Sequence, residues 1–148
     1  FLARLADPLM ARLEPGVEGL DYGSGPGPTL SLMLSERGFA TTDFDPFFAP
    51  DPGPLSRAWD FVTCTATVEH FFHPGREPHP LQRLLRRPGV LGVMTRLLDD
   101  DEGFKNWWYA RDPTHVSFYR EETLEWIAET HGWLLERPNP TVALFLKV

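Results

Sequence analysis

Short apolar runs alternate along the chain with stretches in which apolar residues recur at helical spacing. Two of the runs, residues 60–65 (DFVTCT) and 90–95 (VLGVMT), are apolar on both sides and rich in β-branched residues. Such runs are typical of strands buried in the middle of a parallel sheet. The shorter segments 17–22 and 39–43 are predicted as strands as well. Four strands are therefore expected before residue 96.

Four other segments carry apolar residues three or four positions apart, which places those residues on one face of a helix. They are residues 1–13, 29–37, 81–85 and 124–131. Gly38, Pro88-Gly89 and Gly132 follow the last three segments and are expected to end their helices. Pro8 interrupts the first segment, so we expect Asp7 to cap a second helical start there.

Two apolar runs close the chain, residues 133–136 and 141–148, and only the short link RPNP separates them. A parallel connection needs a dozen or more residues, so these two strands are expected to pair antiparallel. Strands that alternate with helices predict the α/β class. The expected fold is a mostly parallel sheet that finishes with an antiparallel strand.

Composition narrows the class of protein. The 148 residues are 42% hydrophobic and 24% charged, which is typical of one globular domain spanning residues 1–148. A net charge of −7 repels a phosphate backbone, so nucleic acid is not an expected partner. No apolar run approaches the ~18 residues that would span a membrane. A single cysteine and a start unlike a secretory signal favour a cytoplasmic protein.

The stretch GLDYGSGPGPTL, residues 19–30, is a glycine-rich turn between a predicted strand and a predicted helix. Such turns bring backbone N–H groups and a helix N-terminus close to a ligand. Its glycines, Gly23, Gly25 and Gly27, follow the pattern G-x-G-x-G, whereas dinucleotide-binding turns have G-x-G-x-x-G. Pro28 stands where that pattern has its third glycine. The turn suits a ligand other than a pyrophosphate, and a bare structural turn is the alternative.

Two carboxylates accompany the turn. Asp21 ends the first predicted strand, where it would repel a phosphate and attract a cation. Asp45 follows the second strand, at a place where a carboxylate can bind ribose hydroxyls. Asp43 competes for that role, but the spacing from Gly38 favours Asp45. Together they indicate a nucleoside with a positively charged tail, and S-adenosylmethionine is the common cofactor of that description.

Four stretches carry a resemblance to a known family. They are LDYGSGPG (20–27), DFDPFF (43–48), DFVTCTATVEHFFHP (60–74) and RRPGVLGVMT (86–95). In this order they resemble the class I S-adenosylmethionine-dependent methyltransferases. With the terminal strand pair, the resemblance covers residues 17–148, preceded by an N-terminal helical segment, residues 1–16. It implies a Rossmann-like, doubly wound α/β fold with helices on both faces. It also implies a methyltransferase that leaves S-adenosylhomocysteine.

The resemblance implies the residues that contact this cofactor. They are Asp21, Gly23, Ser24, Gly25, Gly27, Phe44, Asp45, Pro46, Cys64 and Thr65. Asp21 would meet the ammonium group and Asp45 the ribose. Phe44, Pro46 and Phe47 would shape the adenine side, and the backbone of Cys64 and Thr65 would contribute further contacts. One departure concerns residues 46–59, because they are too few for the family's usual third strand. That strand is expected to be short or missing.

Residues 99–119 follow a central strand and are expected at the edge of the sheet where ligands bind. Trp107, Trp108 and Tyr109 either fold back as a lid or line an acceptor pocket suited to a cationic or aromatic substrate. His115 is the best candidate for a general base, because an imidazole titrates near ~6.5. A structural histidine bonded to a backbone carbonyl is the equal alternative.

Other histidines and acids do not predict a metal site. His70 and His73, beside Glu69, have H-x-x-H spacing, but this spacing precedes a proline in a predicted loop rather than lying on one helix face. His79 and His115 add no recognisable spacing, so no metal is expected. Glu69-His70 is expected to pack or cap near the edge of the cofactor.

Two other functions compete with a small-molecule methyltransferase. The first is a catalytically inactive S-adenosylmethionine-binding sensor or partner subunit, which would share every cofactor residue. The second is an NAD-dependent oxidoreductase, but Pro28 and the antiparallel last strand argue against it.

Overall fold

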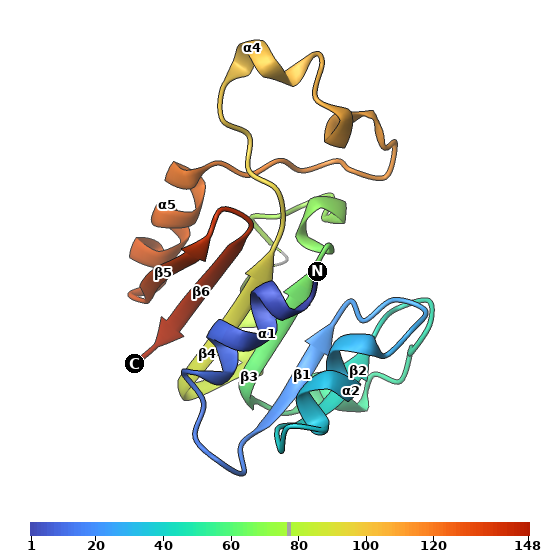
Figure 1. Ribbon diagram of the computed structural model, residues 1–148, viewed down its shortest axis with the longest axis vertical. Helices are drawn as coiled ribbons and strands as arrows, with labels where there is room; N and C mark the ends of the chain where they lie inside the picture. Colours follow the sequence, from blue (N-terminus) through green and yellow to red (C-terminus); the bar gives the residue numbers. More distant parts are fainter. Residues whose placement is uncertain (77) are drawn as a thin grey trace.

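The computed structural model describes residues 1–76 and 78–148, and within them six strands form one sheet (Figure 1). The strands are β1 (Glu18–Tyr22), β2 (Ala40–Phe44), β3 (Trp59–Thr65), β4 (Leu85–Met94), β5 (Leu134–Asn139) and β6 (Val142–Lys147). Their order in the sheet is β2-β1-β3-β4-β6-β5. The first four pair in parallel, whereas β6 is antiparallel to both β4 and β5. The predicted terminal antiparallel pair is confirmed.

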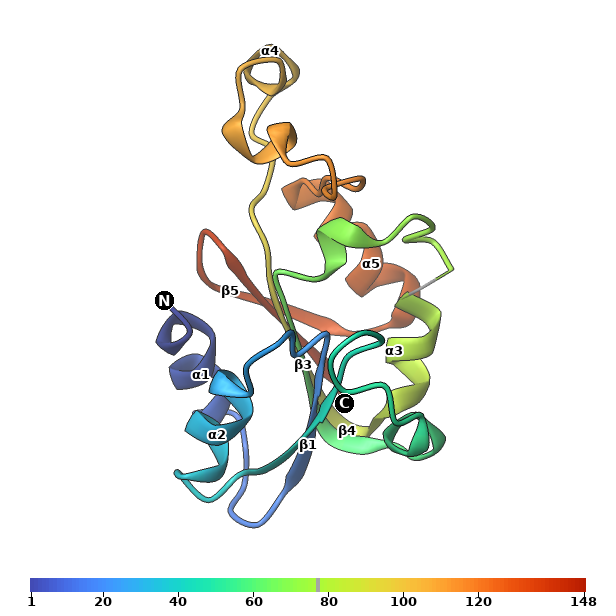
Figure 2. The ribbon, with the colours of Figure 1, turned by 90° about the vertical axis from the view of Figure 1, so that its right-hand side faces the viewer.

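Helices cover both faces of the sheet (Figure 2). The α-helices are α1 (Ala3–Met10), α2 (Thr29–Ser35), α3 (Pro78–Leu84), α4 (Asp101–Phe104) and α5 (Glu121–His131). Three short 3-10 helices are η1 (Gly53–Ser56), η2 (Val68–His70) and η3 (Trp108–Arg111). Leucines of α1 and α2 are buried in a core on one face, and leucines of α3 and α5 in a core on the other. The predicted doubly wound α/β class is confirmed.

The third strand usual in the family is missing. Between β2 and β3 the described chain forms only η1 and an isolated bridge that joins Asp45 and Ala49. As a result β2 is the outermost strand on one side of the sheet. The prediction that this strand would be short or missing is confirmed, because too few residues separate the two strands for another strand and its connections.

One helix boundary was predicted wrongly. Pro8 lies inside α1 and does not start a second helix, and Asp7 pairs with Arg37 at 3.1 Å instead of capping. Leu5 and Leu9, on either side of Pro8, are fully buried against the sheet. We attribute the continuous helix to this burial, which outweighs the one helical hydrogen bond that a proline removes.

A second boundary differs at the end of α3. Pro88-Gly89 was expected to end this helix, but it lies inside β4, which begins at Leu85. The helix ends earlier because Leu85 pairs with Trp59 of β3. The Lys147 ammonium group donates to the carbonyl of Gln82 in the helix at 3.1 Å and to that of Leu85 at 2.6 Å. A side chain at Gly89 would meet a backbone oxygen at 2.6 Å, so this part of the strand needs glycine.

Residues 99–119 project beyond the carboxyl ends of the parallel strands (Figure 1). The two ends of this projecting segment lie side by side. Leu97 and Tyr119 form a parallel bridge, and the Leu98 N–H donates to the Tyr119 carbonyl at 2.8 Å. At its start Asp100 caps α4 by accepting from the Gly103 N–H. In the part of the chain that the structure describes, no helix has the length and apolar composition to cross a bilayer.

Candidate functional site

The glycine turn joins β1 to α2 and has two residues in left-handed conformation, Gly23 at φ +79° and Gly25 at φ +69°. The Phe44 carbonyl at the end of β2 accepts two hydrogen bonds from the turn, from Gly23 N–H at 2.7 Å and Ser24 N–H at 3.2 Å. A side chain at Gly23 would lie 2.3 Å from the hydroxyl of Thr67. The turn is therefore fixed between the carboxyl ends of two strands.

Asp45 is the acidic residue that reaches the turn. Its Oδ2 accepts from the Gly25 N–H at 2.9 Å, and its Oδ1 accepts from the backbone N–H groups of Phe47 and Phe48. A carboxylate offers about four acceptor positions, so one position on Oδ2 remains beside the turn. These contacts favour Asp45 over Asp43 as the residue that meets a ligand held there.

Three carboxylates gather at this edge of the sheet. Asp21 lies opposite Asp43 in the register of β1 and β2, and it accepts from the Thr63 hydroxyl at 2.7 Å. Asp21 is only 4% exposed. Burial raises the pKa of its carboxyl to about 6, and the charges of Asp43 and Asp45 add to the effect.

Two buried oxygens at this edge have no hydrogen-bond partner within the described residues, Asp43 Oδ1 and Thr65 Oγ1. Within the same residues no lysine or arginine forms an ion pair with any of the three carboxylates. Buried polar atoms are nearly always satisfied, and crowded carboxylates repel one another. The edge therefore fits a ligand that carries a positive charge and hydrogen-bond donors, as a sulfonium amino acid does.

Replacing Asp21 by asparagine is expected to change how stability depends on pH. The folded-state pKa is raised from 3.8 to about 6, so the folded protein binds the extra proton between these values. This stabilisation is present at low pH and is lost as the pH rises through about 6. At pH 7.5 the ligand-free Asp21→Asn protein should be more stable than the parent by about 3 kcal/mol, and most of the difference should be gone near pH 4.

Urea unfolding of both proteins at pH 4, 6 and 7.5 measures this difference. Asp51→Asn is the matched control, because Asp51 is an exposed aspartate in the loop after β2 whose carboxylate accepts from the Gly53 backbone N–H. Parallel stability curves for the parent and the Asp21→Asn variant would contradict the assigned pKa.

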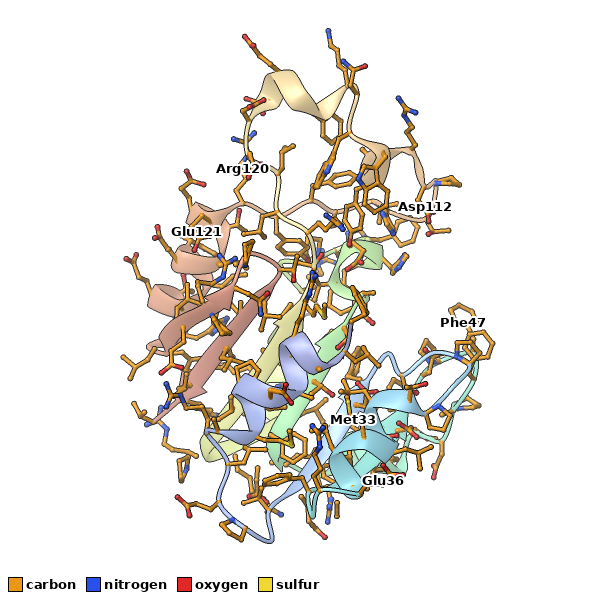
Figure 3. The ribbon with its side chains drawn as sticks, viewed as in Figure 1. Met33, Glu36, Phe47, Asp112, Arg120 and Glu121 are labelled. Carbon is orange, nitrogen blue, oxygen red and sulfur yellow. The ribbon has the colours of Figure 1, made fainter. Side chains whose placement is uncertain are left out.

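The other predicted cofactor residues divide into buried and exposed positions. The ring of Phe44 is buried in the core against Tyr22, and its carbonyl is the group that bonds to the glycine turn. Cys64 is fully buried; burial raises the pKa of its thiol, and the charges of Asp21 and Glu69 raise it further. Phe47 is 84% exposed and points outward from the loop after β2 (Figure 3). The neighbouring Pro46 is exposed as well, and so is Gly27.

The predicted aromatic residues of the projecting segment divide into two groups. Tyr109 is buried, its hydroxyl donates to Glu69 Oε1, and the ring of Trp107 packs against it with centroids 5.1 Å apart. Trp108 is 59% exposed, with the Arg96 guanidinium 4.8 Å from its ring centroid. Tyr109 thus packs back toward the sheet, whereas Trp108 faces solvent.

His115 lies beside Tyr109 and is mostly buried. Its Nδ1 is 2.7 Å from the Tyr109 carbonyl, and its Nε2 is 3.7 Å from Asp112 Oδ2. Figure 3 places Asp112 on the outer side of this segment. Because a carbonyl only accepts, the Nδ1 atom carries the hydrogen and Nε2 keeps its lone pair. The backbone bond expected of a structural histidine is present, and it leaves Nε2 able to accept a proton.

One cluster was missed by sequence reasoning. The ring of His70 lies 5.0 Å from the ring of His115, and both lie near the buried Glu69. The sequence pairs His70 with His73, whereas the structure brings it to a histidine far along the chain. The VEH stretch after a buried strand was a usable signal, but its partner could not be found from spacing. The side chain of His79 lies outside the described residues.

The chain matches known proteins along most of its length. The model of the methyltransferase domain family matches residues 1–137. Among solved structures, a S-adenosylmethionine-dependent methyltransferase from Archaeoglobus fulgidus has a TM-score of 0.69 at 20% identity, covering 91% of this chain and 69% of that one. No curated protein sequence matches the chain.

Two other similar structures are named with their ligands. Magnesium protoporphyrin IX methyltransferase from Synechocystis, with bound S-adenosylhomocysteine, has a TM-score of 0.69 at 14% identity, covering 99% of this chain and 82% of that one. A 1,6-didemethyltoxoflavin-N1-methyltransferase from Burkholderia thailandensis, with its substrate and S-adenosylhomocysteine, has a TM-score of 0.65 at 16% identity, covering 98% and 76%. At such identities these structures establish a shared fold.

Proposed function

The chain belongs to the class I S-adenosylmethionine-dependent methyltransferases, and on this premise we propose that it methylates a small-molecule acceptor. The observation that carries the proposal is the crowded edge of the sheet. There, three carboxylates without a cationic partner in the described chain surround a glycine turn in left-handed conformation. A diphosphate would be repelled by this edge, whereas a sulfonium with an ammonium group would be attracted.

The residues of the site have separate tasks in binding. Asp21 would accept from the ammonium group, and the open position on Asp45 Oδ2 would accept from a ribose hydroxyl. Gly23 and Gly25 let the backbone approach the ligand closely, since neither presents a side chain there. When bound, S-adenosylmethionine supplies the activated methyl group. The protein then supplies alignment and exclusion of water.

We place the acceptor beside the projecting segment, residues 99–119. Tyr109 closes one side of this region, and Trp107, Trp108 and His115 are the predicted substrate residues around it. His115 Nε2 is the proposed proton acceptor, because Nδ1 is already bonded. The acceptors named for the Synechocystis and Burkholderia enzymes are small molecules, which supports the same class here. The net charge of −7 disfavours nucleic acid, and the single buried cysteine suits a reducing cytoplasm.

Thermal unfolding with added ligands tests the proposal. S-adenosylhomocysteine at a hundred times its Kd should stabilise the protein by about 2.7 kcal/mol, which raises the Tm by roughly 8 °C for a domain of this size. NAD at the same concentration should leave the Tm unchanged. A shift with NAD and none with S-adenosylhomocysteine would overturn the assignment and favour an oxidoreductase.

Formation of S-adenosylhomocysteine in the presence of small phenols, amines and carboxylic acids then separates an enzyme from a sensor. Turnover with one acceptor class supports the proposed function. Tight binding of the cofactor with no turnover on any class would instead favour the inactive sensor or partner subunit.

A further inference from the structure

Glu69, His70 and His115 form a compact group of potential metal ligands, which we call the EHH cluster. One side-chain ligand atom from each residue lies within 4.8 Å of the others. Glu69 and His70 belong to η2, which follows β3, whereas His115 belongs to the projecting segment. The two parts are fastened together, because the Glu69 carbonyl accepts from the backbone N–H groups of Val116 at 2.9 Å and Ser117 at 3.0 Å.

Both imidazole rings are held in the same tautomer. His70 donates from Nδ1 to the Thr114 carbonyl at 2.9 Å, and His115 donates from Nδ1 to the Tyr109 carbonyl at 2.7 Å. Each ring therefore keeps its lone pair on Nε2. A hydrogen bond from the second ring nitrogen to a carbonyl is the usual partner of a metal-bound histidine, because it sets the tautomer and orients the ring.

The Glu69 carboxylate is buried without a cation. Glu69 is 1% exposed, and within the described residues its carboxylate accepts from two neutral hydroxyls, those of Tyr109 and Thr95. Among the described residues it forms no ion pair with a lysine or arginine. Burial and the bond to Glu69 raise the pKa of Tyr109, so its hydroxyl remains a donor. Buried carboxylates are normally paired with a cation or bound to a metal, since an isolated buried charge is costly.

We propose that the EHH cluster binds one divalent transition-metal ion, with Glu69, His70 and His115 as ligands and Zn²⁺ as the best fit. Imidazole nitrogens with a carboxylate suit Zn²⁺ and its first-row neighbours, whereas Mg²⁺ and Ca²⁺ prefer oxygen ligands. Two ligands of one tetrahedral zinc lie about 3.4 Å apart, so the cluster needs to contract by roughly 1 Å.

Asp112 lies beside one of the three ligands and is the candidate for a fourth. Asp112 Oδ2 lies 3.7 Å from His115 Nε2, too long for a hydrogen bond but close to the distance between two ligands of the same ion. Asp112 is half exposed, so this position can be taken by its carboxylate or given up to an incoming oxygen or nitrogen. With the fourth position taken by Asp112 or by an incoming group, the proposed ion would have one exchangeable ligand, as catalytic metal sites have.

The metal site adds to the proposed function. Its position beside the acceptor has meaning only if the protein is a methyltransferase, so this part of the inference rests on the proposed function. Thr67, two residues before Glu69, donates from Oγ1 to the Gly23 carbonyl of the glycine turn at 3.2 Å. The cluster therefore adjoins the turn on the side of the projecting segment. A metal-bound Nε2 has no free lone pair, so His115 would be a ligand in the metal-loaded protein, and the proton acceptance proposed above would apply only to the metal-free protein. The ion would instead orient the acceptor and lower its pKa.

Calorimetric titration of the chelator-treated full chain with Zn²⁺ at pH 7.5 tests the inference. We expect one ion per chain, and at least about 100-fold weaker binding in Glu69→Gln, His70→Gln and His115→Gln. Mg²⁺ should not compete. The matched control is His73→Gln, an exposed histidine at the H-x-x-H spacing, which should bind Zn²⁺ like the parent. Co²⁺ should give a visible absorption band in the parent and in His73→Gln only.

The outcomes distinguish a failure of the metal site from a failure of the proposed function. Absence of Zn²⁺ binding in the parent, or loss of binding only in His73→Gln, overturns the site. Binding of S-adenosylhomocysteine by each variant shows that it is folded and reports on the cofactor site independently of the metal. If Glu69→Gln does not fold, the two histidine variants carry the test. Zn²⁺ binding without cofactor binding would leave the metal site standing and overturn the proposed function instead.

Discussion

Replacing Asp45 by alanine is expected to weaken the binding of S-adenosylhomocysteine by on the order of 100-fold or more, about 3 kcal/mol. The substitution removes a buried carboxylate that accepts three backbone hydrogen bonds and has one position left for a ligand. It also frees the Gly25 N–H, so the turn loses the contact that joins it to the loop after β2. Calorimetry measures the affinity, and far-UV circular dichroism confirms that the variant is folded.

Two matched variants locate this effect. Asp51→Asn removes the charge of an exposed aspartate in the same loop and should leave the affinity within about twofold of the parent, as surface changes usually do. Asp43→Asn tests the competing acid, and its effect should be smaller than that of Asp45→Ala. An equal affinity of the Asp45→Ala variant and the parent would refute the assignment of the ribose carboxylate.

Replacing Gly23 by alanine is expected to lower the free energy of unfolding by about 3 kcal/mol and to abolish detectable cofactor binding. Backbone strain and steric overlap both destabilise the variant. A side chain at φ +79° is strained whatever the space, and the new Cβ atom would lie 2.3 Å from the Thr67 hydroxyl. Thr67 also donates to the Gly23 carbonyl, so moving the turn away from Thr67 would break this hydrogen bond. Chemical denaturation measures the stability change.

Two further variants separate strain from overlap. Gly16 has φ +85° with open space around it, so Gly16→Ala reports the conformational cost alone, about 1 kcal/mol. The double variant Gly23→Ala, Thr67→Ala removes the overlapping side chain and should recover roughly half of the lost stability. A Gly23→Ala protein as stable as Gly16→Ala would show that the overlap at Thr67 is relieved by a small shift.

The order of the elements could be predicted because local patterns carry it. The continuous apolar run of β3 predicts a central parallel strand, and the short link between β5 and β6 predicts an antiparallel pair. The structure has both. The boundaries at Pro8 and Pro88-Gly89 could not be predicted. Local rules for proline and glycine end helices, but burial of Leu5 and Leu9 and the pairing of Leu85 with Trp59 outweigh them.

The places in the fold of the proposed cofactor residues could be predicted for the same reason. Asp21, Gly23, Gly25 and Asp45 each occupy the end of a strand or the turn that follows it, so their position in the sequence sets their position at the edge of the sheet. The structure adds that Phe44 and Cys64 point into the core, because side chains alternate along a strand and the family motif does not record which face each residue takes.

The sequence by itself determined the fold class, the missing third strand and the carboxylates around the glycine turn, because these depend on spacing within a few residues. Only the tertiary structure decided that His115 joins Glu69 and His70, that Tyr109 bonds to the same carboxylate, and that His73 stays outside. The physical reason is that these contacts depend on the path of the projecting segment back to the sheet. That path is set by the Leu97–Tyr119 bridge and by packing, and no periodicity in the sequence encodes it.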